Sequence, residues 1–285
     1  MKDHDKFYID SDGVADRTNQ KHEITEYTCC EICGSEYTSH YKTVKAAYSY
    51  DYFKLEKCRR CDLVFVSPRL NKTYRDFCYK NESHVVSWFL KKEKESRLTA
   101  NSILDLLASK ACQKGNLLEI GCGLGTFMET ASERGFSVTG IELNMYLASY
   151  AKNKGLNVLE DDFYRLIFSP SSFDIIVMDQ VLEHMGEPIT ALIKARELLK
   201  PGGYIFIGIP EFDWLKLFLS HIPVPWKSTK PMWSPEDHLF YFKPSTLKKL
   251  VEKAGFRYID ISYSFLTWRI RKLLGLSSGR FLAQK

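Results

Sequence analysis

The sequence contains no apolar run long enough to cross a bilayer, since none approaches the roughly 20 uninterrupted apolar residues of a membrane-spanning helix. Its first residues, MKDHDKFYIDSDG, are too polar and acidic for a secretory signal. The net charge is +5, but no dense stripe of lysine and arginine appears in the first two hundred residues, so the charge alone does not indicate nucleic-acid binding. These absences predict a cytoplasmic globular protein without a transmembrane segment.

Cysteine is absent after residue 122, so all eight cysteines lie in the first half of the chain. Four of them form two Cys-x-x-Cys pairs, Cys30/Cys33 and Cys58/Cys61. In a chain without an export signal, such pairs hold metal more often than disulfides, and two pairs complete a closed four-thiolate zinc site. The spacing therefore predicts a structural zinc. A redox pair is the weaker alternative, and Cys29 is an alternative ligand to Cys30.

The composition divides the chain into four parts. The polar N-terminus is expected to be loosely ordered, short strands surround the cysteine pairs, and an alternation of strands and helices follows residue 114. Strands spaced by about 20 to 30 residues, with helices between them, predict an α/β fold with a doubly wound sheet. The predicted boundaries are an N-terminus at 1–24, a zinc-ribbon-like module at 25–80, a main domain at 81–267 and a basic tail at 268–285.

The stretch LLEIGCGLGTF lacks the third glycine of the dinucleotide-binding fingerprint G-x-G-x-x-G/A. Gly121 and Gly123 fit the first two positions, but Thr126 occupies the third. Glu119 precedes the first glycine by two residues, where an acid is a poor neighbour for a pyrophosphate and suits a cationic amino acid group. This difference favours S-adenosylmethionine over a nicotinamide dinucleotide as the ligand of the turn.

Further acidic residues follow the next expected strands. Glu142 lies 21 residues after Gly121, the position of the acid that accepts ribose hydroxyls in nucleotide-binding folds. Asp161 and Asp162 precede Phe163, so that a carboxylate can accept the adenine amino group while the aromatic ring stacks on the base. A solvated loop is the alternative for Asp161 and Asp162.

Five segments, LLEIGCGLGTF, VTGIELN, LEDDF, FDIIVMDQVLEHMGEP and ARELLKPGGYIFIGIP, resemble the successive motifs of class I S-adenosylmethionine-dependent methyltransferases in order and spacing. The resemblance covers about residues 117–210 and implies a Rossmann-like, mostly parallel seven-stranded sheet with S-adenosylmethionine as cofactor. The segment CRRCDLVFVSPR also resembles zinc-binding modules that precede methyltransferase domains in bacterial sugar and polysaccharide pathways. The cofactor-binding residues that the resemblance and the pattern imply are Glu119, Gly121, Cys122, Gly123, Gly125, Glu142, Leu143, Asp161, Asp162, Phe163, Asp179, Gln180 and Val181.

Two histidines are candidates for removing a proton from the methyl acceptor. His184 follows the fourth expected strand, and His238 lies in PEDHLFYF, which resembles the acceptor-side segment of zinc-containing sugar methyltransferases. A structural hydrogen bond is the alternative role for each. The apolar segment 212–227 and the basic segment 268–285 are candidates for contact with a membrane surface, with ordinary packing as the alternative.

Together these features predict a methyltransferase acting on an oxygen or carbon nucleophile of a small or glycan-type acceptor. One alternative is an RNA methyltransferase that grips RNA with its zinc ribbon, although acidic residues mixed into the ribbon disfavour a nucleic-acid partner. The other alternative is a scaffold protein that binds S-adenosylmethionine without turnover.

Overall fold

The computed structural model describes residues 25–45, 52–110, 113–210, 234–261 and 278–285. The chain forms two compact units, and each takes in segments that are far apart in the sequence. The first unit comprises Met1–Tyr74, Glu183–Gly186 and Glu211–Leu247. The second comprises Arg75–Leu182, Glu187–Pro210 and Lys248–Lys285.

The first unit is built from short strands. Its members are β1 (Thr25–Glu26), β2 (Thr38–Lys45), β3 (Tyr52–Cys58), β4 (Val64–Val66), β5 (Arg69–Leu70) and β11 (Phe240–Tyr241). Strands β11, β4, β3 and β2 form an antiparallel sheet in that order, while β1 pairs with β5. Strand β3 alternates apolar and polar residues, so that Phe53 and Leu55 are buried on one face of the sheet.

Helices and longer strands make up the second unit, and α2 and α9 each run across its boundary with the first. The elements are α2 (Lys72–Lys80), α3 (Val85–Lys91), α4 (Glu93–Lys110), β6 (Gly115–Ile120), α5 (Thr126–Glu133), β7 (Phe136–Glu142), α6 (Met145–Asn153), β8 (Val158–Glu160), β9 (Phe173–Asp179), α7 (Pro188–Leu198), β10 (Leu199–Pro210), α9 (Pro244–Lys253), β12 (Arg257–Ile261) and β13 (Ser278–Gln284).

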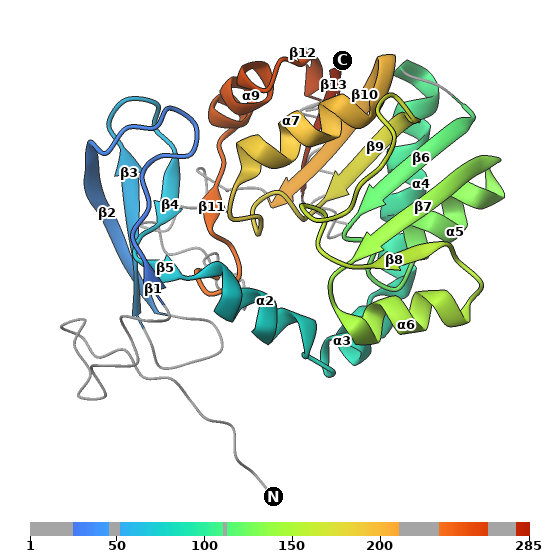
Figure 1. The fold of residues 1–285 in the computed structure, drawn as a ribbon, viewed down its shortest axis with the longest axis horizontal. Helices are drawn as coiled ribbons and strands as arrows, with labels where there is room; N and C mark the ends of the chain where they lie inside the picture. The colour runs from blue at the N-terminus through green and yellow to red at the C-terminus, as the bar shows by residue number, and fades with distance from the viewer. Residues whose placement is uncertain (1–24, 46–51, 111–112, 211–233, 262–277) are drawn as a thin grey trace, which may run out of the picture. The chain divides into compact units, whose positions relative to one another are not determined.

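The seven strands of the second unit lie in the order β12-β13-β10-β9-β6-β7-β8 (Figure 1). Strand β13 runs antiparallel to both of its neighbours, and the other strand pairs are parallel. The chain leaves β6 toward β7 and β8 on one side and returns to β9 and β10 on the other. This is the doubly wound, mostly parallel seven-stranded sheet that the sequence predicted, with a topological switch point between β6 and β9.

Apolar side chains of α4 and α5 cover one face of this sheet, and α7 crosses the other face (Figure 1). The helical spacing of α4 brings Ile103, Leu104 and Leu107 onto one side, where each is almost fully buried against sheet residues such as Val177. At about 25 cal/mol per Å² of apolar surface, burying each of these side chains contributes about 2 kcal/mol. The sheet is therefore a rigid frame for the loops at its strand ends.

The C-terminal strand β13 was not expected from the sequence. Residues 278–284 pair with both β10 and β12 in the interior of the sheet. Of the two segments considered for membrane contact, 212–227 lies outside the described residues, as does 268–277, and membrane contact stays a prediction. Among the residues described, no helix combines the length and the apolarity required to span a bilayer.

Candidate functional site

The glycine turn joins β6 to α5 at the switch point of the sheet. Gly121, Gly123 and Gly125 have φ values of 74°, 54° and 78°, a region that side chains with a Cβ rarely adopt. A Cβ on Gly121 would lie 2.5 Å from Cγ2 of Val181. The turn therefore requires glycine for its backbone shape as well as for space, and it presents the N-terminus of α5 at the edge of the sheet.

Glu142 ends β7 and fixes the loop beside it. Its Oε2 accepts a hydrogen bond from the Gly123 amide and its Oε1 from the Asn144 amide, both at 2.8 Å. The hydroxyl of Tyr79 donates to the same carboxylate. Burial raises the pKa of Glu142, and these hydrogen bonds oppose that rise because they favour the ionised form. The same hydrogen bonds hold the Glu142 carboxyl group in one orientation.

Glu119 and Asp179 lie near the ends of the adjacent strands β6 and β9. Within the described part of the chain, Oε2 of Glu119 and Oδ1 of Asp179 are buried and have no hydrogen-bond partner. Burial, with the nearby charges of Asp179 and Glu142, raises the pKa of Glu119 well above its ordinary value. Burial also raises the pKa of Asp179 to about 6, although Arg280 opposes the shift. Three carboxylates therefore converge where a cation would relieve their repulsion.

Asp162 and Phe163 are buried just after β8, whereas Asp161 is half-buried. The Asp162 Oδ1 accepts a hydrogen bond from the Tyr164 amide at 3.0 Å. Lys194 on α7 anchors this loop, because its Nζ donates to the carbonyl oxygens of Phe163 and Leu166 at 2.6 Å each and lies 4.9 Å from the Phe163 ring centroid. The loop is thus held as a preformed platform.

The remaining predicted cofactor residues lie along the same strand ends. Cys122 is buried, and burial raises the pKa of its thiol. Leu143 is half-buried between Glu142 and the residue that caps α6. Gln180 has a φ of 58° and donates its amide to the Gly208 carbonyl at 2.8 Å, so the chain turns sharply after β9. Val181 is the residue that would meet a Cβ on Gly121.

Sequence reasoning missed three residues that support this arrangement. Tyr79 comes from a helix outside the recognisable motifs. Asn144 caps α6 through its Oδ1 and donates its Nδ2 to the Tyr79 carbonyl at 2.6 Å, thereby tying the two segments together. Arg280 lies on β13 opposite Gly208, which in turn pairs with Asp179. Of these three residues, Asn144 alone carried a sequence signal, because asparagine is a typical helix-capping residue and this one directly follows the VTGIEL motif.

In the first unit, the structure brings the two predicted histidines together. Their ring centroids are 4.8 Å apart, and Nδ1 of His184 donates to the Asp237 carbonyl at 2.9 Å. The His184 side chain is 40% exposed, and its ring lies against the ring of His238. Desolvation lowers the pKa of His184 to about 4 and, together with the nearby His184 ring, the pKa of His238 to about 3. Both imidazoles are therefore neutral at neutral pH.

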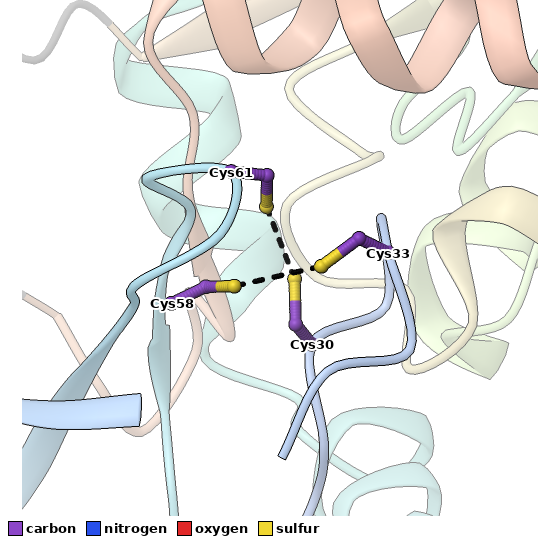
Figure 2. Close-up of side chains that lie close together, drawn as sticks. All are labelled: Cys30, Cys33, Cys58 and Cys61. Atoms are coloured by element: carbon purple, nitrogen blue, oxygen red, sulfur yellow. Dashed lines mark hydrogen bonds between the residues drawn. The ribbon is translucent and has the colours of Figure 1, made fainter. Parts of the chain in front are cut away.

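The four predicted cysteines also converge (Figure 2). The Sγ atoms of Cys30 and Cys61 lie 3.3 Å apart, and those of Cys33 and Cys58 lie 3.5 Å apart. All four thiols are free, and the neighbouring Cys29 is exposed. Burial raises the pKa of Cys58, but donation from the amides of Arg60 and Cys61 and from nearby thiols outweighs it and brings the pKa to about 7. The geometry thus selects Cys30 over Cys29 as the member of the cluster.

A doubly wound sheet with β13 antiparallel, a glycine turn after its first strand and acids at the ends of the next strands defines the class I methyltransferase fold. In agreement, the family described as "Methyltransferase domain" matches residues 92–261. The chain therefore belongs to this family, and the matched region is a class I S-adenosylmethionine-dependent methyltransferase domain.

Curated relatives include ubiquinone biosynthesis O-methyltransferases. The protein from Coxiella burnetii is 26% identical over 153 residues, which is 52% of this chain and 65% of that relative. The protein from Colwellia psychrerythraea is 29% identical over 154 residues, covering 51% of this chain and 62% of the relative. The chain thus spans less than two thirds of the length of these relatives, and the first 91 residues lie outside the family match.

Solved structures show the same fold. An S-adenosylmethionine-dependent methyltransferase from Aquifex aeolicus superposes with a TM-score of 0.52 at 19% identity, covering 70% of this chain and 97% of that one. A protein from Pyrococcus horikoshii superposes with a TM-score of 0.51 at 17% identity, covering 75% and 98%. At these identities the likeness concerns the fold alone.

Proposed function

We propose that the protein transfers a methyl group from S-adenosylmethionine to an oxygen or carbon nucleophile of a small or glycan-type acceptor. The observation that carries this proposal is the convergence of Glu119, Glu142 and Asp179 around the glycine turn. S-adenosylmethionine supplies a methyl group on a cationic sulfonium, next to a cationic amino group. A cluster of buried carboxylates suits these charges and disfavours a pyrophosphate.

The residues present fit each part of this cofactor. The unpartnered Oε2 of buried Glu119 is available to the amino group, and the fixed carboxylate of Glu142 is suited to two ribose hydroxyls. Buried Phe163 with Asp162 provides an apolar face and an acceptor for the adenine. We propose that Leu143, Asp161 and the turn at Gln180 and Val181 complete the cofactor contacts. Alignment of donor and acceptor by such a frame can lower the barrier by about 7–11 kcal/mol.

Before methyl transfer, an oxygen nucleophile must lose its proton. We propose that His184 and His238 promote this loss, because their rings lie together and both are neutral at neutral pH. His184 also follows Val181 closely in the chain. The curated relatives are named as O-methyltransferases of ubiquinone biosynthesis, which supports a hydroxyl on a small molecule as the acceptor. The resemblance of the cysteine module supports a sugar or glycan.

We also propose that Cys30, Cys33, Cys58 and Cys61 hold a zinc ion. Four thiolates form a closed tetrahedral set, which is the ligand set of structural rather than catalytic zinc. The ion would stabilise a unit whose strands are short. Free thiols at these positions also fit a reducing, cytoplasmic setting.

Incubation with S-adenosylmethionine carrying a labelled methyl group tests the proposal. The acceptors should include small phenols, nucleotide sugars and RNA, followed by fractionated cell extract. Label in a small molecule or glycan supports the proposal. Label in RNA would establish the RNA alternative, which the pairing of Arg69 with Glu26 and of Lys57 with Asp62 disfavours because it neutralises two cations of the first unit. Cofactor binding without any turnover would establish the scaffold alternative.

A further inference from the structure

A second group of metal-binding side chains lies in the first unit, apart from the cysteines. The ligating atoms of Glu183, His184 and His238 all lie within 4.8 Å of one another. Nε2 of His184 is 3.8 Å from Oε1 of Glu183. Two ligands on one tetrahedral ion, each about 2.0–2.2 Å from it, lie about 3.4 Å apart. The ligating atoms are therefore at most about 1.4 Å farther apart than the ligands of a bound ion.

Backbone hydrogen bonds fix the group although its members come from distant parts of the chain. The Glu183 carbonyl accepts the Leu239 amide at 2.9 Å and the Phe240 amide at 3.3 Å. The His238 amide donates to the Ser234 carbonyl at 2.7 Å. The strand that contains Phe240 pairs in turn with β4 of the four-stranded sheet. These backbone hydrogen bonds thus hold the segments that carry the three side chains next to one another.

His184 carries the outer-sphere partner that metal-binding histidines usually have. A carbonyl oxygen can only accept, so the 2.9 Å contact with Asp237 places the proton on Nδ1 of His184. This leaves the lone pair on Nε2, the nitrogen that faces Glu183. Hydrogen bonds of this kind fix the tautomer and the ring orientation of metal ligands.

Glu183 adds the negative charge that a cation site requires. Its side chain is 1% exposed, in contrast to the exposed acids of the surface. A buried carboxylate beside two imidazoles offers one anionic and two neutral ligands, a set that divalent transition-metal ions take.

We propose that Glu183, His184 and His238 bind one divalent transition-metal ion through one carboxylate oxygen and two imidazole nitrogens. Two histidines and one carboxylate suit zinc, cobalt or ferrous iron and leave coordination positions open, unlike the closed four-thiolate cluster. The open positions take a hydroxyl oxygen of the methyl acceptor.

This inference rests on the proposed function and specifies how the histidines act. The bound ion lowers the pKa of the acceptor hydroxyl, whose proton passes to water. The resulting alkoxide oxygen bonds to the methyl carbon while the carbon–sulfur bond of the cofactor breaks and its electron pair remains on sulfur. No oxidation or reduction occurs, so the ion keeps its charge throughout.

A titration with Co²⁺ of the full chain, loaded beforehand with zinc at the cysteines, tests the site. Visible absorption should show one added equivalent per chain, with ligand-field bands but without the charge-transfer band of cobalt thiolates. The variants Glu183→Gln and His238→Ala should each weaken this binding at least tenfold. His40→Ala is the matched control, because His40 is an exposed histidine 3.9 Å from Glu56 and should bind Co²⁺ as the wild type does.

Calorimetric titration with S-adenosylmethionine, run on each variant, reports whether the protein remains folded. The metal site would be overturned if the protein bound no added equivalent of Co²⁺. It would also be overturned if the bound Co²⁺ showed thiolate absorption that His238→Ala left unchanged. Full methyl transfer by chelator-treated protein that retains its cysteine-bound zinc would overturn its role toward the acceptor. Co²⁺ binding as expected, combined with no methyl transfer by the wild type to any acceptor, would reject the proposed function and leave the metal site standing.

Discussion

The two units gather their chemical groups in different ways. In the second unit, Glu119, Glu142 and Asp179 come from the ends of adjacent strands in one sheet, and main-chain pairing sets their positions. In the first unit, the four cysteines come from two separate Cys-x-x-Cys segments, and their sulfur atoms meet without a disulfide between them (Figure 2). A sheet with an extensive core can hold repelling carboxylates in place, whereas short strands need a ligand to join their loops.

This difference has an energetic consequence. The carboxylates of the second unit are destabilised by burial and by one another before any ligand arrives, so they favour a cation strongly. The proposed zinc would join the thiols of the first unit and stabilise that unit. The proposed cofactor site is thus preformed, whereas the cysteine cluster would be completed by its ion.

The largest expected effect is the loss of zinc from Cys58→Ser. Structural zinc binding contributes about 10–16 kcal/mol in small zinc modules, and a missing thiolate removes much of it. We expect loss of the zinc and increased amide hydrogen exchange over residues 25–70, measured by elemental analysis and mass spectrometry. Cys29→Ser is the control, because Cys29 is exposed and outside the cluster. Full zinc content in Cys58→Ser would disprove the four-cysteine site.

The next largest effect is expected for Glu142→Gln. The amide cannot accept equally from Gly123, Asn144 and two ribose hydroxyls, and lost charged hydrogen bonds cost about 1.5–3 kcal/mol, or about 10- to 150-fold in affinity. Calorimetry should show this weakening for S-adenosylmethionine. Glu160→Gln alters an exposed acid at the end of β8, paired with Lys152, and should leave the affinity unchanged. Equal affinities of the two variants would contradict the assignment.

A smaller effect is expected for Lys194→Met. Without the ammonium group, the carbonyl oxygens of Phe163, Tyr164 and Leu166 lose their common donor, and the adenine platform becomes less ordered. We expect about tenfold weaker cofactor binding, or about 1.4 kcal/mol, with little change in kcat at saturating cofactor. Lys152→Met removes an exposed lysine as a control. A fall in kcat with unchanged affinity would show that Lys194 does not act through the platform.

The smallest effect concerns pH. Asp179 has its pKa raised to about 6 in the free protein, and a bound cation lowers it, so binding releases a proton. Affinity for S-adenosylmethionine should therefore rise about fivefold from pH 5 to pH 7 as Asp179 ionises. Asp179→Asn should flatten this dependence over the same range. If the affinity for S-adenosylmethionine instead fell with rising pH, ionisation of the carboxylate cluster could not be the cause of the pH dependence.

The sequence predicted the sheet, and it placed the proposed cofactor-binding residues in contiguous motifs. A strand, its terminal acid and the next turn are neighbours in the chain, so Glu119 and the glycines could be recognised together. Parallel strands with short connections then placed Glu142 and Asp179 at the same edge. Local pattern and tertiary position coincide in this part of the molecule.

Elsewhere the contacts are distant in sequence and left no local pattern. Arg280 could not be predicted because β13 follows residues with the composition of a basic tail and is stabilised by pairing with β10 and β12. The pairing of His184 with His238 depends on backbone bonds from Leu239 and Phe240 to Glu183. The choice of Cys30 over Cys29 depends on which of two adjacent side chains points inward, which spacing alone does not decide.

The central claim is that the second unit binds S-adenosylmethionine at the glycine turn. Calorimetric titration of the wild-type protein with S-adenosylmethionine, followed by titration with NAD under the same conditions, tests it most directly. The account predicts saturable binding of S-adenosylmethionine at about one molecule per chain and no binding of NAD, because the carboxylate cluster favours a cation over a pyrophosphate. Binding of NAD, or no binding of S-adenosylmethionine, would contradict it.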